Sequence, residues 1–278
     1  MQNSYQVLIK KYSQLLKDIT HIPQKETEIL LLHILKKDML WLHINYHKVC
    51  DTATQQQLKK LVEKRATHYP LEYITSKTTF YEKEFIVQDG VLIPRWETEI
   101  IIDKAKVLLK NIVNPTVVEI GTGSGIISIT LALLIKDIKL IAVDISDKAL
   151  ELAKKNAIKH KVDHKITFIK SNLFSNLKTI DFNMCISNPP YISNSYKLPY
   201  NVQYEPFDAL FGGCNGDELL KKIIQETHKN NIQYLICEMG YDQKKSLDKF
   251  LQRFNPLKIK FYKDLSKFNR GFEVEFKI

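Results

Sequence analysis

Cysteine is scarce in this sequence, and no two cysteines lie close together. The 278 residues include four, Cys50, Cys185, Cys214 and Cys237, and no C-x-x-C motif. A chain of this length can bury a core without disulfide staples, and a zinc site would need clustered cysteines or histidines. The eight histidines have spacings that indicate no site. We therefore expect neither a disulfide framework nor a metal site.

Long apolar runs are also missing. No stretch approaches the ~18 to 20 uninterrupted apolar residues that a membrane-spanning helix needs. The first residues, MQNSYQVLIKKYSQ, lack the apolar block of a signal peptide. We expect a cytoplasmic protein that does not associate with a membrane.

Arginine is rare although the chain is basic. The formal net charge is +10, but only four of the 41 basic side chains are arginines. A dedicated nucleic-acid surface would show a dense basic run interleaved with aromatic residues, and no such run is present. We attribute most of the charge to a lysine-biased composition and expect no stable nucleic-acid complex.

The first quarter of the chain has a helical pattern. Apolar residues recur at spacings of three and four over residues 5–69, as on one face of a helix. Asp51 or Thr52 fits an N-cap for the segment that follows. We predict a small helical domain at residues 1–74.

A change to an extended pattern follows the helical region. The segment TTFYEKEFIVQDGVLIP, residues 78–94, reads as two short extended runs around a turn at Gln88-Asp89-Gly90. We predict a β-hairpin linker at residues 75–93.

Strands and helices alternate through residues 94–278, which predicts an α/β domain with a mostly parallel sheet and right-handed crossovers. The last two strands lack a convincing helix between them, so we expect a terminal antiparallel hairpin. The predicted strands are residues 116–120, 139–145, 166–170, 181–187, 233–239, 257–262 and 271–278. The predicted helices lie near residues 97–110, 125–135, 147–160, 215–229 and 241–253.

A glycine-rich turn connects the first of these strands to a helix. Gly121, Gly123 and Gly125 would let backbone N–H groups approach a ligand at the helix N-terminus. Such turns also bind dinucleotides, but G-x-G-x-G is shorter than the G-x-G-x-x-G fingerprint of a pyrophosphate site. We expect the whole turn, with Thr122 and Ser124, to bind a nucleoside cofactor that has no diphosphate.

The next strand ends in an acidic residue, Asp144, about 20 residues after the glycines. A carboxylate there can accept both ribose hydroxyls of an adenosine. The competing role, an N-cap of the following helix, suits Ser146 or Asp147 better. We therefore predict that Asp144 binds ribose.

Three further residues complete the predicted cofactor site. Glu119, two residues before Gly121, is expected to accept an ammonium group of the cofactor, directly or through water. In S-adenosyl-L-methionine, a nucleoside cofactor without a diphosphate, this is the ammonium of the methionine part. Asn172 and Leu173 follow the third strand and are placed to meet the adenine. Leu173 could equally be a core residue.

The sharpest motif is Asn188-Pro189-Pro190-Tyr191, directly after a predicted strand. Methyl transfer to a planar NH2 group is difficult because its lone pair is delocalised, so the nitrogen must be oriented by hydrogen-bond acceptors. The Asn188 side-chain carbonyl, shared with the cofactor site, and the Pro189 backbone carbonyl can do this. Consecutive prolines fix the backbone, and Tyr191 can stack on the flat group. The alternative is a stiff turn without function.

These motifs and several longer segments identify a family. Nearly from end to end, the chain resembles the protein-(glutamine-N5) methyltransferases of peptide chain release factors. The glycine turn and Asn-Pro-Pro-Tyr occur in many amino-group methyltransferases, whereas LIPR-x-ETE combined with YEP-x-x-AL-x-GG is much more specific. The matching segments are PLEYI (70–74), LIPRWETE (92–99), EIGTGSG (119–125), AVDIS (142–146), SNPPYI (187–192), YEPFDALFGG (204–213) and KDLSKFNRGFE (263–273).

The resemblance implies a Rossmann-like class I methyltransferase domain with a seven-stranded sheet at residues 94–278, and a substrate-recognition role for the helical domain. It implies S-adenosyl-L-methionine as cofactor and S-adenosyl-L-homocysteine as product. The implied acceptor is the glutamine of the Gly-Gly-Gln loop of release factors. Asn188 and Pro189 would then hold the glutamine amide while Tyr191 packs over it.

Two residues depart from the family pattern. Trp96 stands where proline is usual, which could alter the loop over the active site, and Asn172 stands where an acidic residue is common, which could weaken the adenine contact. Arg95 can be read as a site residue or as part of a surface ion pair at a helix start. Glu205 is expected to brace the loop beside Asn188.

Two other functions fit parts of the sequence. A methyltransferase for an exocyclic amine of adenine or guanine in RNA or DNA can use the same Asn-Pro-Pro-Tyr chemistry, but 278 residues leave no room for a separate target-recognition domain. A non-enzymatic adenosylmethionine-binding module would have no need for the motif at Asn188.

Overall fold

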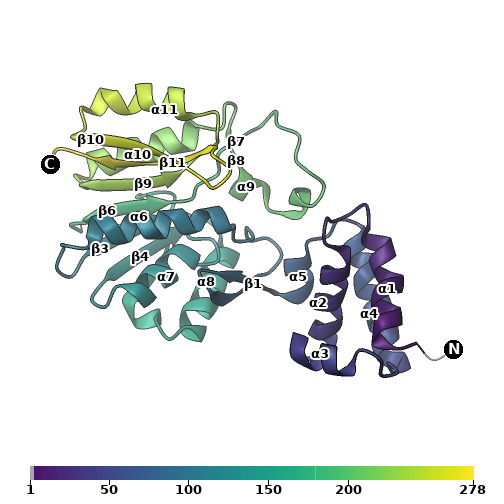
Figure 1. Ribbon diagram of the computed structural model, residues 1–278. Coiled ribbons are helices and arrows are strands. Elements are labelled where there is room, and N and C mark those ends of the chain that lie inside the picture. Colours follow the sequence, from purple (N-terminus) through teal and green to yellow (C-terminus); the bar gives the residue numbers. More distant parts are fainter. Residues whose placement is uncertain (1–2, 179) are drawn as a thin grey trace. The chain divides into compact units, whose positions relative to one another are not determined.

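The protein divides into two compact units, which we describe separately (Figure 1). The computed structural model describes residues 3–178 and 180–278. The first unit comprises the chain up to Ser76 together with Leu198–Tyr204, and the second comprises Lys77–Lys197 and Glu205–Ile278. Among the described residues, no helix is both long and apolar enough to cross a membrane.

The first unit is a bundle of helices around one apolar core (Figure 1). Asp51 is the N-cap of the longest helix because its Oδ1 accepts a hydrogen bond from the Thr54 backbone N–H at 2.9 Å, as expected at this position. A buried ion pair between Glu26 and Arg65, 2.6 Å apart, links two helices. The helices are α1 (Tyr5–Ser13), η1 (Gln14–Leu16), α2 (Pro23–Leu35), α3 (Met39–Asn45), α4 (Thr52–Ala66) and α5 (Leu71–Thr75).

A short segment from much later in the sequence, Leu198–Tyr204, belongs to this first unit. The Tyr204 hydroxyl donates a hydrogen bond to the Thr67 carbonyl at 2.8 Å. Its ring centroid lies 5.1 Å from that of Tyr69 in an edge-on contact. Sequence patterns did not predict this grouping, because it depends on contacts between residues about 130 positions apart.

The hairpin lies earlier than predicted. It is formed by β1 (Lys77–Phe80) and β2 (Lys83–Ile86), and its turn is Tyr81–Glu82, where both residues have positive φ angles of 48° and 60°. The predicted turn at residues 88–90 was therefore wrong for the hairpin, although Gly90 does adopt a positive φ. Burial of Phe80 and Phe85 in the core of the second unit selects this register over the stronger glycine turn signal.

The second unit contains the predicted seven-stranded, mostly parallel sheet, which confirms the α/β fold class. The strand order is β10-β11-β9-β6-β3-β4-β5. The five strands from β9 to β5 run parallel, and β11 and β10 form the expected terminal antiparallel hairpin. The strands are β3 (Thr116–Ile120), β4 (Lys139–Asp144), β5 (Ile166–Lys170), β6 (Met184–Ser187), β9 (Tyr234–Glu238), β10 (Lys258–Lys263) and β11 (Asn269–Glu275).

Helices cover both faces of this sheet (Figure 1). Successive strand residues point to opposite faces, so Val117 packs in one core with residues of α6 and α7, while Val118 packs in the other with residues of α10 and α11. The helices are α6 (Glu99–Leu109), α7 (Ile126–Leu134), α8 (Asp147–Lys159), α10 (Glu218–Lys229) and α11 (Lys244–Leu251).

Several short elements at the carboxyl edge of the sheet were not predicted. A 3₁₀ turn, η2 (Trp96–Thr98), precedes α6, and helix α9 (Phe207–Leu210) leads into β8 (Phe211–Gly213). Strand β8 pairs in parallel with β7 (Ile192–Ser193), immediately after the Asn-Pro-Pro-Tyr motif. These elements are too short to carry a periodic pattern.

Candidate active site

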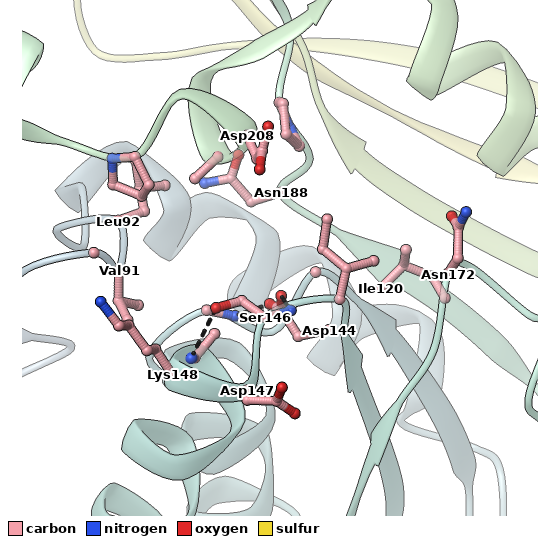
Figure 2. Close-up of a pocket in the computed structure, with 18 of the residues that line it drawn as sticks. Val91, Leu92, Ile120, Asp144, Ser146, Asp147, Lys148, Asn172, Asn188 and Asp208 are labelled. Carbon is pink, nitrogen blue, oxygen red and sulfur yellow. Dashed lines mark hydrogen bonds between the residues drawn. The ribbon is translucent and has the colours of Figure 1, made fainter.

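A cavity of about 560 Å³ lies at the carboxyl ends of the parallel strands in the second unit (Figure 2). Doubly wound sheets bind their ligands at this edge. The volume falls within the ~300–1,000 Å³ typical of small-molecule sites. The predicted site residues that line it are Gly121, Gly123, Asp144, Asn172, Leu173, Asn188 and Pro190. A smaller adjoining pocket of about 30 Å³ adds Glu119, Thr122 and Ser124.

The three glycines of the turn have two different roles. All three have positive φ angles, 72° at Gly121, 55° at Gly123 and 84° at Gly125. A Cβ at Gly121 or Gly123 would meet nothing within 4 Å and would project into open space, whereas one at Gly125 would lie 2.9 Å from Ile129 and 3.0 Å from Ala153. The first two glycines therefore keep the cavity open. Gly125 does not line it and instead permits close packing between helices α7 and α8.

Asp144 is held against the glycine turn. Its Oδ2 accepts a hydrogen bond from the Gly123 backbone N–H and its Oδ1 accepts one from the Ser146 N–H, each at 2.9 Å. Ser146 is the N-cap of α8, because its Oγ accepts from Ala149 N–H. The capping role is thus filled by another residue, and the remaining lone pairs of the Asp144 carboxylate are available to a ligand. Burial raises the pKa of this carboxyl.

Glu119 is fully buried behind the turn with one oxygen satisfied and one not. Its Oε2 accepts hydrogen bonds from the Thr122 hydroxyl at 2.9 Å and the Ser128 backbone N–H at 3.1 Å, and also from the Ser128 hydroxyl. Its Oε1 has no hydrogen-bond partner within the part of the chain that the structure describes. An unpaired buried carboxylate oxygen is costly, and a ligand ammonium would supply the missing partner.

Glu119 also makes stability depend on pH. Burial raises its pKa from 4.5 to about 8, so between these values the folded protein binds more protons than the unfolded chain and its stability falls as pH rises. As the pH rises from about 5 to about 8, we expect the free energy of unfolding of the cofactor-free wild type to fall. In Glu119→Gln this fall should be smaller, by on the order of 3 kcal/mol. Urea unfolding at both pH values measures this.

The change in unfolding free energy between the two pH values must be compared between wild type and variant, because burial also raises the pKa of Asp144 and Glu238. Those residues are present in both proteins, so their contributions cancel to first approximation. Equal losses of stability in wild type and Glu119→Gln would contradict a buried, protonated Glu119.

Asn172, which is labelled in Figure 2, and its neighbour Leu173 both line the cavity. Asn172 is exposed. Leu173 has a positive φ of 52°, and its carbonyl accepts a hydrogen bond from the Ser171 hydroxyl at 2.8 Å. Leu173 also packs against the core beneath α10 and α11. Leu173 therefore both lines the cavity and packs against the core, so the two predicted roles are compatible.

Asn188 follows strand β6 and lines both the large cavity and the smaller pocket. Its amide nitrogen Nδ2 donates a hydrogen bond to the Thr98 hydroxyl oxygen at 3.0 Å. The carbonyl oxygen Oδ1 is the other end of the same planar amide, so it is turned away from Thr98. This leaves the acceptor end of the group for a ligand, as the predicted chemistry requires.

Unlike Asn188, Pro189 and Tyr191 do not line the cavity. The Tyr191 hydroxyl donates a hydrogen bond to Oε1 of Glu238 at 3.0 Å, and its ring packs against the core. Oε2 of the same carboxylate accepts a hydrogen bond from the Thr98 hydroxyl at 2.8 Å. Tyr191 and Asn188 are therefore connected through two buried residues, Thr98 and Glu238.

Thr98 and Glu238 were missed in the sequence. Thr98 lies within the LIPRWETE segment, where its charged neighbours are the stronger local signal. Glu238 ends the strand YLICE, and a carboxylate at the carboxyl end of an otherwise apolar strand next to β6 is a detectable signal. Its partners could not have been named, because Thr98 comes from a distant turn.

Glu205 braces the segment before α6, part of which lines the smaller pocket together with Asn188. Its carboxylate accepts hydrogen bonds from the Ile93 backbone N–H at 3.0 Å and from the Arg95 guanidinium at 2.5 Å. Arg95 also donates to the Ile93 carbonyl at 2.6 Å. Glu205 is buried while Arg95 is partly exposed. Arg95 lines the smaller pocket, so it combines a structural ion pair with a place at the site.

The geometry suits a nucleoside joined to an amino acid. Asp144 offers acceptors beside an open backbone turn, and Glu119 lacks one partner for its carboxylate. Among the described residues, no group of three or more His, Cys, Asp or Glu side chains could hold a metal ion.

Comparison with protein families identifies both parts of the chain. Residues 8–75 match the PrmC N-terminal domain, and residues 99–205 match the Methyltransferase small domain. Among solved structures, the hMettl16 catalytic domain in complex with a MAT2A 3′UTR hairpin has a TM-score of 0.59 at 18% identity, covering 70% of this chain and 76% of that one. At this identity the likeness shows the class I methyltransferase fold alone.

Curated relatives are considerably more similar in sequence. A bifunctional methyltransferase of Rickettsia typhi is 35% identical over 99% of this chain, which spans only 58% of that relative. A release factor glutamine methyltransferase of Dictyoglomus turgidum is 43% identical over 71% of each chain. That of Buchnera aphidicola is 34% identical over 91% of this chain and 93% of the relative. The chain therefore belongs to the release factor glutamine methyltransferase family, whose methyl donor is S-adenosyl-L-methionine.

Proposed function

We propose that the protein transfers a methyl group from S-adenosyl-L-methionine to the side-chain amide nitrogen of the glutamine in the Gly-Gly-Gln loop of peptide chain release factors. The observation that carries the proposal is the orientation of Asn188, which lines the cavity and commits its amide nitrogen to Thr98. Its carbonyl end is then the acceptor for a substrate N–H. The relatives from Dictyoglomus turgidum and Buchnera aphidicola, both named release factor glutamine methyltransferases, support the same acceptor.

The cofactor would be held by the glycine turn and the acidic residues around it. Gly121 and Gly123 leave space for close backbone approach, Thr122 and Ser124 line the adjoining pocket, and Asp144 would accept from ribose hydroxyls. Gly125 would contribute indirectly by keeping α7 packed on α8.

Other residues would hold the two ends of the cofactor. Glu119 would accept from the methionine ammonium through its unpartnered Oε1. Asn172 and Leu173 line the cavity where adenine would lie. Bound in this way, the cofactor supplies an electrophilic methyl group on a sulfonium centre.

The residues of the site would have to orient a poor nucleophile, the side-chain amide nitrogen of glutamine. The amide lone pair is delocalised, so the Asn188 carbonyl, which lines the cavity, would accept one N–H bond and orient the nitrogen. The Pro189 backbone carbonyl is proposed as the second acceptor on the sequence motif alone, because Pro189 does not line the cavity. As the nitrogen becomes cationic, the same two dipoles stabilise it. Pro190 keeps the backbone rigid and lines the cavity. A strong base is unnecessary because the proton leaves after the nitrogen has gained its positive charge.

In this proposal Tyr191 does not pack over the glutamine, because it does not line the cavity. Its hydroxyl is bonded to Glu238, so Tyr191 would support the motif from behind. We further propose that the helical domain, residues 1–74, recognises the release factor, that residues 75–93 connect it to the methyltransferase domain at 94–278, and that the enzyme acts in the cytoplasm.

Mass spectrometry tests the acceptor directly. We expect incubation with S-adenosyl-L-methionine to add one methyl group, about 14 Da, to a release factor, on the glutamine of its Gly-Gly-Gln loop. A Gln→Ala variant of that loop should remain unmodified. Labelling of RNA or DNA, with the release factor unchanged, would instead favour the alternative base-amine methyltransferase. The hMettl16 likeness does not favour that alternative, because it extends only to the fold.

A further inference from the structure

Four side chains, of which only Asn188 lines the cavity, form a continuous hydrogen-bonded chain. Asn188 Nδ2 donates to Thr98 Oγ1 at 3.0 Å, Thr98 Oγ1 donates to Glu238 Oε2 at 2.8 Å, and the Tyr191 hydroxyl donates to Glu238 Oε1 at 3.0 Å. Thr98 is fully buried and Glu238 is 1% exposed. Water therefore cannot substitute for a missing partner at little cost.

The direction of each bond follows from the chemistry of the groups. Both hydroxyl groups donate to Glu238 in the structure. Burial raises the pKa of Glu238, while these two hydrogen bonds and the nearby charge of Arg270 favour its ionised form, in which the carboxylate has only acceptors. Burial next to Glu238 raises the pKa of Tyr191, which keeps this phenol protonated as a donor. Once the single hydroxyl proton of Thr98 points to Glu238, its oxygen can only accept.

The amide of Asn188 then has one satisfactory orientation. With Nδ2 toward Thr98, a donor meets an acceptor. In the opposite orientation Oδ1 would face the Thr98 oxygen, so two acceptors would meet and the NH2 group would be presented to the cavity. An NH2 group in that place would repel the N–H bonds of an amide substrate.

We propose that Thr98 and Glu238 are positioning residues that hold the Asn188 side-chain amide with its carbonyl toward the substrate. This inference rests on the proposed function for its substrate, a planar NH2 group, while the orientation itself is a property of the free protein. Neither residue lines the cavity, so both act through Asn188 without touching the substrate.

The matched pair Thr98→Val and Thr98→Ser tests the idea. Valine keeps the shape of threonine and removes the hydroxyl, whereas serine keeps the hydroxyl. We expect Thr98→Val to lower kcat about 10- to 100-fold, since a misplaced group of this kind can cost about 100-fold. Thr98→Ser should stay within about threefold of wild type, and the KM for the release factor and the Kd for S-adenosyl-L-homocysteine should change little in both.

A control with the same chemistry separates this effect from loss of a buried hydroxyl. Thr227 in α10 is also fully buried and donates to the Ile223 carbonyl at 2.7 Å, but it does not line the site. Thr227→Val should therefore retain the wild-type kcat. If Thr98→Val methylates at the wild-type rate, or if Thr227→Val loses as much kcat as Thr98→Val, the positioning role is wrong.

A substrate-free measurement distinguishes this inference from the proposed function. In ¹⁵N NMR spectra of the protein bound to S-adenosyl-L-homocysteine, the Asn188 side-chain NH2, assigned by its absence in Asn188→Ala, should exchange slowly with solvent. Protection should persist in Thr98→Ser and disappear in Thr98→Val. An enzyme inactive on release factors would refute the proposed function, while this pattern would still support the network. Protection unchanged in Thr98→Val would overturn it.

Glu238→Gln provides a second variant if Thr98→Val does not fold. The glutamine has the shape of glutamate but carries one donor end, so it cannot accept from both Thr98 and Tyr191. We expect a kcat loss of the same order with cofactor affinity retained. A Glu238→Gln protein with full activity would refute the proposal.

Discussion

Asn188→Ala is expected to lower kcat for release-factor methylation by about 10³-fold, to the limit of detection, because loss of one preorganised polar group at a reacting centre has effects of that size. The variant removes the carbonyl that would orient the acceptor nitrogen. It leaves Asp144, Gly123 and the rest of the cofactor site in place. Single-turnover methylation with labelled S-adenosyl-L-methionine measures the rate, and calorimetric titration with S-adenosyl-L-homocysteine measures cofactor binding.

A second asparagine provides the control. Asn194 follows the short strand β7, is exposed and does not line the cavity, so Asn194→Ala makes the same chemical change outside the site. It should methylate at the wild-type rate. A normal rate in Asn188→Ala would rule out the amide-orienting mechanism. Loss of cofactor binding in parallel with the rate would instead assign Asn188 to the cofactor site.

Asp144→Ala should act on the cofactor. We expect binding of S-adenosyl-L-homocysteine to weaken by roughly 1 to 3 kcal/mol, about 5- to 150-fold in Kd, through loss of charged hydrogen bonds to the ribose. The side chain also holds the Gly123 N–H, so part of the loss will come from a looser glycine turn. Calorimetric titration measures the change in Kd.

Two further variants separate the contributions at Asp144. Asp144→Asn retains an acceptor of similar shape without the charge and should lose less affinity than alanine. Asp137→Ala removes an exposed carboxylate from the turn before β4 and should bind normally. Unchanged affinity in Asp144→Ala would show that the ribose lies elsewhere.

Much of the methyltransferase fold could be predicted because each long element has a strong local signal. Strand β3 is a mostly apolar run followed by glycines, and α8 begins at Asp147, after its N-cap Ser146, and has an apolar stripe along one face. Some predicted strands were longer than the observed ones, because the predictions included polar residues at the strand ends. Strand β6 begins at Met184, three residues after the predicted start, and the side chain of the preceding Asn183 accepts a hydrogen bond from the Thr116 N–H.

The sequence could predict those parts of the site that are formed by neighbouring residues in a motif. Residues 121–124 of the glycine turn, Asp144 and Asn188 line the cavities because each lies at or just after a strand end at the same sheet edge. Thr98 and Glu238 remained hidden because their importance depends on partners from other elements. The hairpin turn was misplaced for the same reason, since tertiary burial of Phe80 and Phe85 overrode the local turn chemistry.

The discontinuity of the helical unit has a consequence for biosynthesis. Its last seven residues, Leu198–Tyr204, leave the ribosome only after strands β3 to β6 have been translated. Domains commonly begin to fold during synthesis, N-terminal parts first, but the nascent helices cannot acquire the Tyr204–Thr67 hydrogen bond until most of the sheet has been made. A gene fragment ending at Ser76 would encode every helix of the bundle from α1 to α5 and still express an incomplete unit.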